Sequence, residues 1–97
     1  MIVRIVKMTF EENKVGDFLK LFNETAAQIR NFPGCNHLEL YRDHEHNNVL
    51  FTYSFWETKA SLENYRKSEL FKETWARTKV LFSAKAEAWS VARIWNG

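Results

Sequence analysis

The fold is decided by the stretch Val49-Leu50-Phe51-Thr52-Tyr53-Ser54-Phe55-Trp56, which continues through Glu57 to Thr58. One alternating set of its side chains is entirely bulky, and the other combines Leu50 and Trp56 with two hydroxyl residues. A period of two is typical of a β-strand whose two faces meet different surroundings. The stretch therefore predicts a strand that is apolar on one face and wholly or partly covered on the other.

Two helical segments are predicted after this strand. Thr58 and Ser68 are both residue types that cap helix N-termini, so each is expected to begin a segment. Beyond Ser68, the larger side chains recur at steps of four, three and four residues, at Phe71, Trp75, Thr78 and Phe82. This spacing makes an amphipathic helix, which we expect to extend to about Phe82. Its aromatic face must lie on another surface, and together with the preceding strand it indicates a pocket.

The remaining chain divides into three strands and one longer helix. We expect strands at residues 2–9, 35–42 and 86–95, and a helix at residues 14–31 whose apolar residues recur at helical spacing. Pro33-Gly34 ends this helix, because proline cannot continue the hydrogen-bond ladder and glycine permits a tight turn. Asn47-Asn48 tolerates a hairpin turn, so the two middle strands are predicted to pair antiparallel.

The order strand, helix, strand, strand, helix, strand predicts a single α+β domain of the ferredoxin-like type over residues 1–97. With right-handed crossovers it gives a four-stranded antiparallel sheet with both helical regions on one face. Two apolar sets compete for that face. One is Val3, Ile5, Leu38, Leu40, Trp89, Val91 and Trp95, and the other is Ile2, Val6, Met8, Phe51, Tyr53 and Phe55. The set left uncovered predicts a partner sheet, and the commonest partner is a second copy of the chain.

Composition and charge exclude several classes of protein. The net charge is only +2 and the basic residues are scattered among acidic ones, which argues against a nucleic-acid-binding face. No apolar run approaches the roughly 20 residues of a membrane helix, and the first strand lacks the cleavage site of a signal peptide. The single cysteine, Cys35, cannot form an internal disulfide. We therefore expect a cytoplasmic protein that binds neither nucleic acid nor membrane.

Three short motifs resemble the antibiotic biosynthesis monooxygenase family, and the resemblance covers nearly the whole chain. They are Phe32-Pro33-Gly34-Cys35, Trp56-Glu57 and Tyr65-Arg66-x-Ser68-x-Leu70-Phe71. The resemblance implies a homodimer of ferredoxin-like subunits, a dimeric α/β barrel, with a cavity between each sheet and its helices. Members of that family oxidise polycyclic phenols to quinones without metal or flavin, degrade haem, or have no established activity.

The chemistry-bearing positions of that family match less well than the scaffold. Relatives that degrade haem carry an Asn, a Trp and an iron-ligating His where this chain has Val6, Tyr65 and Trp75. Haem degradation by that route is therefore disfavoured, and we expect no cofactor. Quinone-forming relatives carry a Trp that Trp56 matches, whereas their Asn and Tyr positions hold Thr52 and Leu62 here.

The resemblance and the residue pattern together predict a pocket for a small aromatic substrate. The predicted substrate-binding residues are Arg4, Trp56, Tyr65, Phe71 and Trp75, and the predicted proton-handling residues are His37 and Tyr53. Each has a structural alternative. The aromatic residues can simply fill the core, Arg4 can form a salt bridge with Glu39 or Glu87, and His37 can be a hydrogen-bonded strand residue at an interface.

His44 and His46 flank Glu45 at the predicted hairpin tip with no third histidine nearby, so no metal site is expected.

Two functional hypotheses remain. The first hypothesis is a cofactor-independent monooxygenase for a small electron-rich phenol or quinol, whose own carbanion or phenolate reduces oxygen while the protein excludes water and orients the ring. The second is a non-catalytic homodimeric domain that binds a small apolar ligand or is purely structural. An open cavity with a converging polar group would favour the enzyme.

Overall fold

Strands and helices alternate in the predicted order. In the computed structural model, which describes residues 1–97, the elements are β1 (Ile2–Thr9), α1 (Val15–Arg30), β2 (Cys35–Arg42), β3 (Val49–Trp56), α2 (Lys59–Arg66), α3 (Glu69–Lys79) and β4 (Glu87–Val91), with a 3-10 turn at Glu12–Lys14 before α1. The first three strands have the bounds expected from their side-chain alternation.

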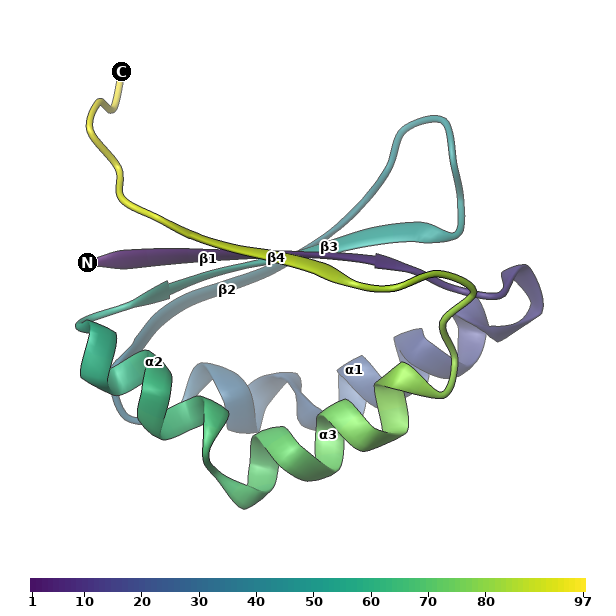
Figure 1. Ribbon diagram of the computed structural model, residues 1–97, viewed down its shortest axis with the longest axis horizontal. Coiled ribbons are helices and arrows are strands. Elements are labelled where there is room, and N and C mark those ends of the chain that lie inside the picture. Colours follow the sequence, from purple (N-terminus) through teal and green to yellow (C-terminus); the bar gives the residue numbers. More distant parts are fainter.

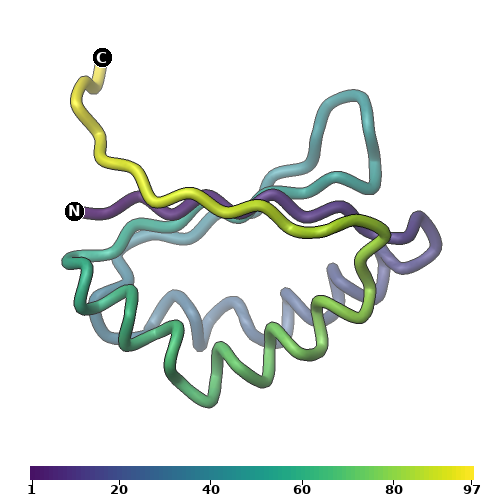
Figure 2. Tube along the Cα trace, in the orientation of Figure 1, coloured from purple at the N-terminus to yellow at the C-terminus, as the bar shows by residue number.

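One antiparallel sheet carries all the helices on a single face. The strand order is β2-β3-β1-β4, so β3 and β1 are central and β2 and β4 are edges. Helices α1, α2 and α3 all lie below the sheet in Figure 1, and the Cα trace of Figure 2 shows the same two layers. The fold is therefore the predicted ferredoxin-like α+β domain. None of its helices combines the length and apolar character needed to cross a bilayer.

The pairing register corrects the predicted division of apolar residues between the two faces. Cys35 pairs with Trp56 but His37 pairs with Phe55, so β2 contains one extra residue at a bulge. Beyond the bulge, Leu38 and Leu40 turn toward the helices, where Leu38 lines a cavity and Leu40 packs on the core. A bulge inverts the alternation of every later residue of its strand, which the sequence pattern did not reveal.

The face away from the helices, here called the open face, is lined by large side chains from all four strands. Its apolar members are Val3, Ile5, Tyr41, Phe51, Tyr53, Phe55, Trp89 and Val91. Apart from Tyr41, which was in neither predicted set, these residues were divided by the prediction between two opposite faces, but the register brings them together. The segment after β4 rises on this side in Figure 1, and the guanidinium carbon of Arg93 lies 5.0 Å from the ring centroid of Phe55.

The core contains two separate clusters of buried residues, one toward each end of the sheet, while the buried Val3, Leu21 and Ile29 belong to neither. Met8, Phe10, Phe18 and Leu50 form the first, and Cys35, Trp56 and Leu62 form the second. The rings of Phe10 and Phe18 stack with centroids 4.4 Å apart. A domain of this size commonly has one contiguous core, so the division leaves space between the clusters.

The helix caps follow the prediction, whereas two segment ends do not. The hydroxyls of Thr58 and Ser68 accept hydrogen bonds from backbone N–H groups at the starts of α2 and α3. Helix α3 ends at Lys79, not near Phe82, because Phe82 forms a β-bridge with Phe10 and packs on its ring at 5.3 Å. The last strand was predicted over residues 86–95 but ends at Val91. Val91 already pairs with Val3, so beyond it β1 is almost exhausted and offers no further partner.

The turn at Gly34 supplies a first test of the fold. Gly34 has φ of +88°, and a Cβ there would collide with Cβ and Oγ of Ser61. Gly34→Ala should therefore lower the free energy of unfolding by about 1–3 kcal/mol. Gly16→Ala is the matched control, because nothing lies within 4 Å of the added methyl group, and in helix α1 it should raise stability by about 0.5–1 kcal/mol. Urea denaturation measures both changes, and equal midpoints for the two variants would contradict this account.

Candidate functional site

A cavity separates the sheet from the helices between the two core clusters. Its volume is about 350 Å³, and 14 of its 21 lining residues are hydrophobic. Met8 and Phe18 of the first cluster line one end, and Trp56 and Leu62 of the second line the other. Cavities that hold small ligands begin at about 300 Å³, so this one suits a small molecule of a few rings.

An uninterrupted run of aromatic rings forms one wall. Trp56 of β3 stacks on Tyr65 of α2 with ring centroids 4.7 Å apart, and Tyr65 meets Phe71 edge to face at 5.2 Å. Phe71 in turn lies parallel to Trp75 at 5.9 Å. All four residues were predicted as substrate-binding residues, and all four line the cavity. The rings leave an open space beside them, although Trp56 itself is only 1% exposed and belongs to the second core cluster.

Small side chains on β4 leave the space across from the aromatic wall unfilled. Val6 of β1 pairs with Ala88, and Arg4 pairs with Ser90, so the cavity side of β4 carries small residues, and Ala86 just before the strand continues this alternating row. Larger residues of β4 alternate with them and belong to the open face. The alternation of small and large residues in this segment is visible in the sequence, but the sequence analysis did not predict that it would create a cavity. A row of small residues beside a run of large aromatics is the signal that could have located it.

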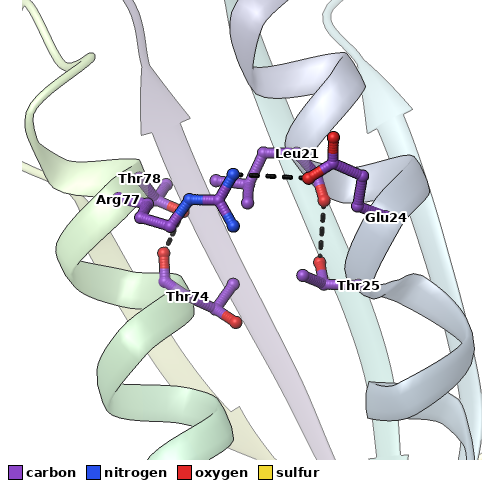
Figure 3. A network of polar contacts seen from close by, with 6 residues as sticks. All are labelled: Leu21, Glu24, Thr25, Thr74, Arg77 and Thr78. Carbon is purple, nitrogen blue, oxygen red and sulfur yellow. Dashed lines mark hydrogen bonds and ion pairs between the residues drawn. The ribbon is translucent and has the colours of Figure 1, made fainter.

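Three of the six hydroxyl groups of the cavity wall are already bonded within the protein, those of Thr25, Ser54 and Thr78. Thr25 donates to the Leu21 carbonyl at 3.0 Å, and Thr78 donates to the Thr74 carbonyl at 2.7 Å. Figure 3 shows both bonds on facing turns of α1 and α3, beneath the Arg77–Glu24 ion pair that joins these helices. Such bonds satisfy the hydroxyls within their own helices, which keeps this part of the wall apolar.

The Tyr65 hydroxyl is available to a ligand, as are the hydroxyls of Thr52 and Thr74. It makes no hydrogen bond within the chain, and it is not fully enclosed, because every fully buried side-chain nitrogen or oxygen has a partner. Burial, with a smaller contribution from Cys35, raises the pKa of Tyr65. The group therefore stays protonated and can donate a hydrogen bond to a ligand at neutral pH. By contrast, the indole N–H of Trp56 is engaged, since it donates to Ser54 Oγ at 2.9 Å.

Two cations complete the lining. Arg4 donates from Nη1 to Ser90 Oγ at 2.9 Å, and Arg66 donates from Nη1 to Glu63 Oε1 at 3.3 Å. The alternative expectation, a salt bridge from Arg4 to Glu39 or Glu87, does not form: Glu87 lies 3.9 Å from Lys7, and Glu39 pairs with His37. Arg66 belongs to one of the family motifs in the sequence, but it was not predicted to be a site residue. Its place in the last turn of an exposed helix made it indistinguishable from a solvated charge.

The predicted proton-handling residues are not in the cavity. His37 and Tyr53 both lie on the open face, on the opposite side of the sheet from the helices. His37 Nε2 lies 2.7 Å from Glu39 Oε1, and its ring packs 5.0 Å from Phe55. Tyr53 packs edge to face on Phe55 at 5.2 Å. For His37 the bulge in β2 is the reason, because it reverses the faces that simple alternation gives to His37 and Leu38. For Tyr53 the regular alternation of β3 is enough, since Thr52, Ser54 and Trp56 face the cavity.

The chain matches one family and many solved structures. The model of the antibiotic biosynthesis monooxygenase family matches residues 1–77. A structure described as an antibiotic biosynthesis monooxygenase superposes with a TM-score of 0.90 at 16% identity, covering 97% of this chain and 99% of that one. A conserved protein from Methanosarcina mazei Go1 has a TM-score of 0.87 at 22% identity, covering 94% and 91%.

A third structure is named by its chemistry. It is a variant of SnoaB, a cofactor-independent oxygenase from Streptomyces nogalater, and it superposes with a TM-score of 0.87 at 16% identity, covering 98% of this chain and 94% of that one. At these identities the likeness demonstrates the fold alone. No curated protein sequence matches the chain.

The raised pKa of Tyr65 predicts a specific loss of stability in alkali. Above about pH 10 a tyrosine in the unfolded chain ionises, whereas Tyr65 in the folded chain keeps its proton. The unfolded state then binds fewer protons than the folded state, so the free energy of unfolding falls as pH rises. Tyr65→Phe removes this contribution. Between about pH 9 and pH 11, the wild type should lose up to about 1.4 kcal/mol more than the variant in urea titrations. Parallel pH profiles would mean that the hydroxyl is fully solvated.

Proposed function

The chain belongs to the antibiotic biosynthesis monooxygenase family, and on this premise we propose that it is a cofactor-independent monooxygenase acting on a small electron-rich phenol or quinol. The observation that carries the proposal is the aromatic-walled cavity, into which Trp56, Tyr65, Phe71 and Trp75 all project. Flat aromatic walls suit a flat aromatic substrate, because offset and edge-to-face ring contacts are favourable. The cofactor independence of SnoaB, which shares the fold, supports the same reading.

The proposed reaction needs only the substrate and molecular oxygen. A phenol with a free ring position loses its hydroxyl proton, and the resulting phenolate transfers electrons to O₂ to form a carbon–oxygen bond at the ring. Cleavage of the O–O bond then leaves one oxygen atom on the ring as the second quinone carbonyl and releases the other as water. The ring is oxidised by four electrons and O₂ is reduced by four, so neither metal nor flavin is required for the balance.

The residues of the cavity serve this reaction by binding and orientation. The aromatic wall excludes water and holds the ring in a fixed plane, and the free Tyr65 hydroxyl donates a hydrogen bond to a substrate oxygen. The guanidinium of Arg4 favours the phenolate over the neutral phenol, since a nearby positive charge lowers the pKa of an acid. No carboxylate or imidazole lines the cavity, so the substrate's proton leaves through solvent at the mouth. The same absence of imidazole from the lining disfavours haem as the substrate.

That absence of an acid–base residue also favours a second candidate function. A cavity with aromatic walls and no general base can bind a small apolar ligand without turning it over. The two candidates share a binding site and differ in whether oxygen is consumed, so one experiment separates them.

Oxygen consumption tests the enzyme hypothesis directly. With a panel of naphthols and dihydroxynaphthalenes, we expect enzyme-dependent uptake of one O₂ per quinone, with one ¹⁸O atom in the product from ¹⁸O₂. Added catalase should return no oxygen, because water and not hydrogen peroxide is the co-product. Ala88→Leu, which fills the cavity, should abolish uptake, whereas Ala27→Leu on the exposed side of α1 should not. Saturable quenching of tryptophan fluorescence by these phenols without oxygen uptake would contradict the enzyme and leave the binding module.

The open face provides the argument for a homodimer. Trp89 and Val91 are 45% and 43% exposed on it, and Ile94 and Trp95 beyond β4 are 96% and 81% exposed. An apolar surface of this kind indicates an interface, and two-fold pairing of identical chains is the commonest solution. We therefore propose a dimer that joins the two open faces, with His37 and Tyr53 acting there as interface residues. A cytoplasmic location is proposed with it, because the buried free thiol of Cys35 suits a reducing compartment.

Sedimentation tests the dimer. At micromolar concentration the mass should be about twice the 11.6 kDa of the chain. Trp89→Asp should shift the protein toward a monomer, since a charge buried without a partner is costly. Val80→Asp is the control, because Val80 is 72% exposed at the end of α3 and away from the open face, and it should leave the dimer intact. A wild-type monomer at that concentration, or a Trp89→Asp dimer as stable as the wild type, would refute the interface.

A further inference from the structure

The lining of the cavity carries positive charges and no negative charge. Among its 21 lining residues only Arg4 and Arg66 are charged, and no Asp, Glu or His is present. Burial, and then the charge of Arg66, lower the pKa of Arg4, while the more weakly acting Glu63 raises it. Arginine side chains remain cationic in proteins, and of the two Arg4 is half-buried whereas Arg66 is exposed. The lining therefore carries positive charge with no negative charge beside it, and an anion would supply the missing charge.

Neither arginine is neutralised by a carboxylate inside the cavity. Arg4 forms no ion pair, and its one hydrogen bond, to the Ser90 hydroxyl at 2.9 Å, orients the guanidinium without offsetting its charge. Arg66 is paired only with Glu63, which does not line the cavity. A guanidinium has five N–H donors, so most donors of Arg4 are free. Partly buried charge without a partner is unfavourable, and a ligand that supplies the missing charge would be bound correspondingly well.

We infer that the cavity takes an aromatic carboxylate, whose carboxylate lies between Arg4 and Arg66 while its ring packs on Trp56, Tyr65 and Phe71. Two guanidiniums and the single Glu63 carboxylate leave a net local charge of +1, which matches a monoanion better than a phosphate dianion. The planar guanidinium fork also fits a carboxylate through paired hydrogen bonds. A carboxylic acid supplies this charge at neutral pH, whereas a phenol must first be deprotonated in the site, because phenols ionise near pH 10 and carboxylic acids near pH 4.

This inference rests on the proposed function in taking the cavity as the substrate site, but its test requires no turnover. Isothermal titration calorimetry would compare 2-naphthoate with 2-naphthamide, a neutral probe of nearly the same shape that the protein cannot oxidise. Because hydrogen bonds between charged groups are stronger than neutral ones, the wild type should prefer naphthoate by about tenfold or more. Arg4→Gln and Arg66→Gln should each reduce this preference at least severalfold while naphthamide affinity changes little, and Arg4→Lys should retain part of it.

Arg77→Gln is the matched control, since Arg77 pairs with Glu24 outside the cavity and should leave the preference intact. Equal affinity of the two probes, failure of both to bind, or a preference that survives both Gln variants would overturn the inference. The test of carboxylate binding can fail or succeed independently of the test of oxygen uptake. Oxygen uptake from neutral naphthols without a preference for carboxylate would refute the inference alone. Selective naphthoate binding without oxygen uptake from carboxylated or neutral dihydroxynaphthalenes would refute the oxygenase and leave the carboxylate site standing.

Discussion

The contact between Trp56 and Tyr65 is the interaction on which the site depends. Trp56 is only 1% exposed, its indole N–H is bonded to Ser54, and its ring stacks on Tyr65 at 4.7 Å. This contact ties the end of β3 to α2 and closes one end of the cavity. The run of rings that continues through Phe71 to Trp75 begins here. Without that stack, α2 would have little to hold it over the sheet, because Leu62 is its only buried residue.

The two faces of the sheet differ in character: one borders the cavity and the other is the open face. Toward the helices, β4 presents small side chains and β1 presents Arg4 and Val6, so the space between the core clusters stays unfilled. On the open face, the alternate residues of those strands form an aromatic and aliphatic surface that carries His37 and Glu39 at its margin. The proposed ligand cavity and the proposed dimer face can therefore change independently, since a substitution at a given strand position affects one face and leaves the other.

The cavity combines an apolar interior with positive charge, and this combination suits chemistry driven by the substrate. An anionic aromatic ring is a better electron donor to oxygen than a neutral one, and cations in a low-dielectric space stabilise it more strongly than water would. Because no carboxylate or imidazole lines the wall, the proposed reaction would rely on charge and confinement and not on a base within the cavity. The chain thus retains the scaffold of its family.

Local sequence determined the elements, and long-range pairing determined the site. The limits of β1, β2 and β3, the caps Thr58 and Ser68, and the aromatic wall all follow from periodicity and capping, which act over a few residues. The helix face of Leu38, the removal of His37 from the cavity and the early end of β4 were not predictable in this way. They depend on a bulge and on where a partner strand ends, and both are properties of two chain segments at once. The convergence of Arg4 and Arg66 is of the same kind, because only the folded chain brings two residues 62 positions apart to one cavity.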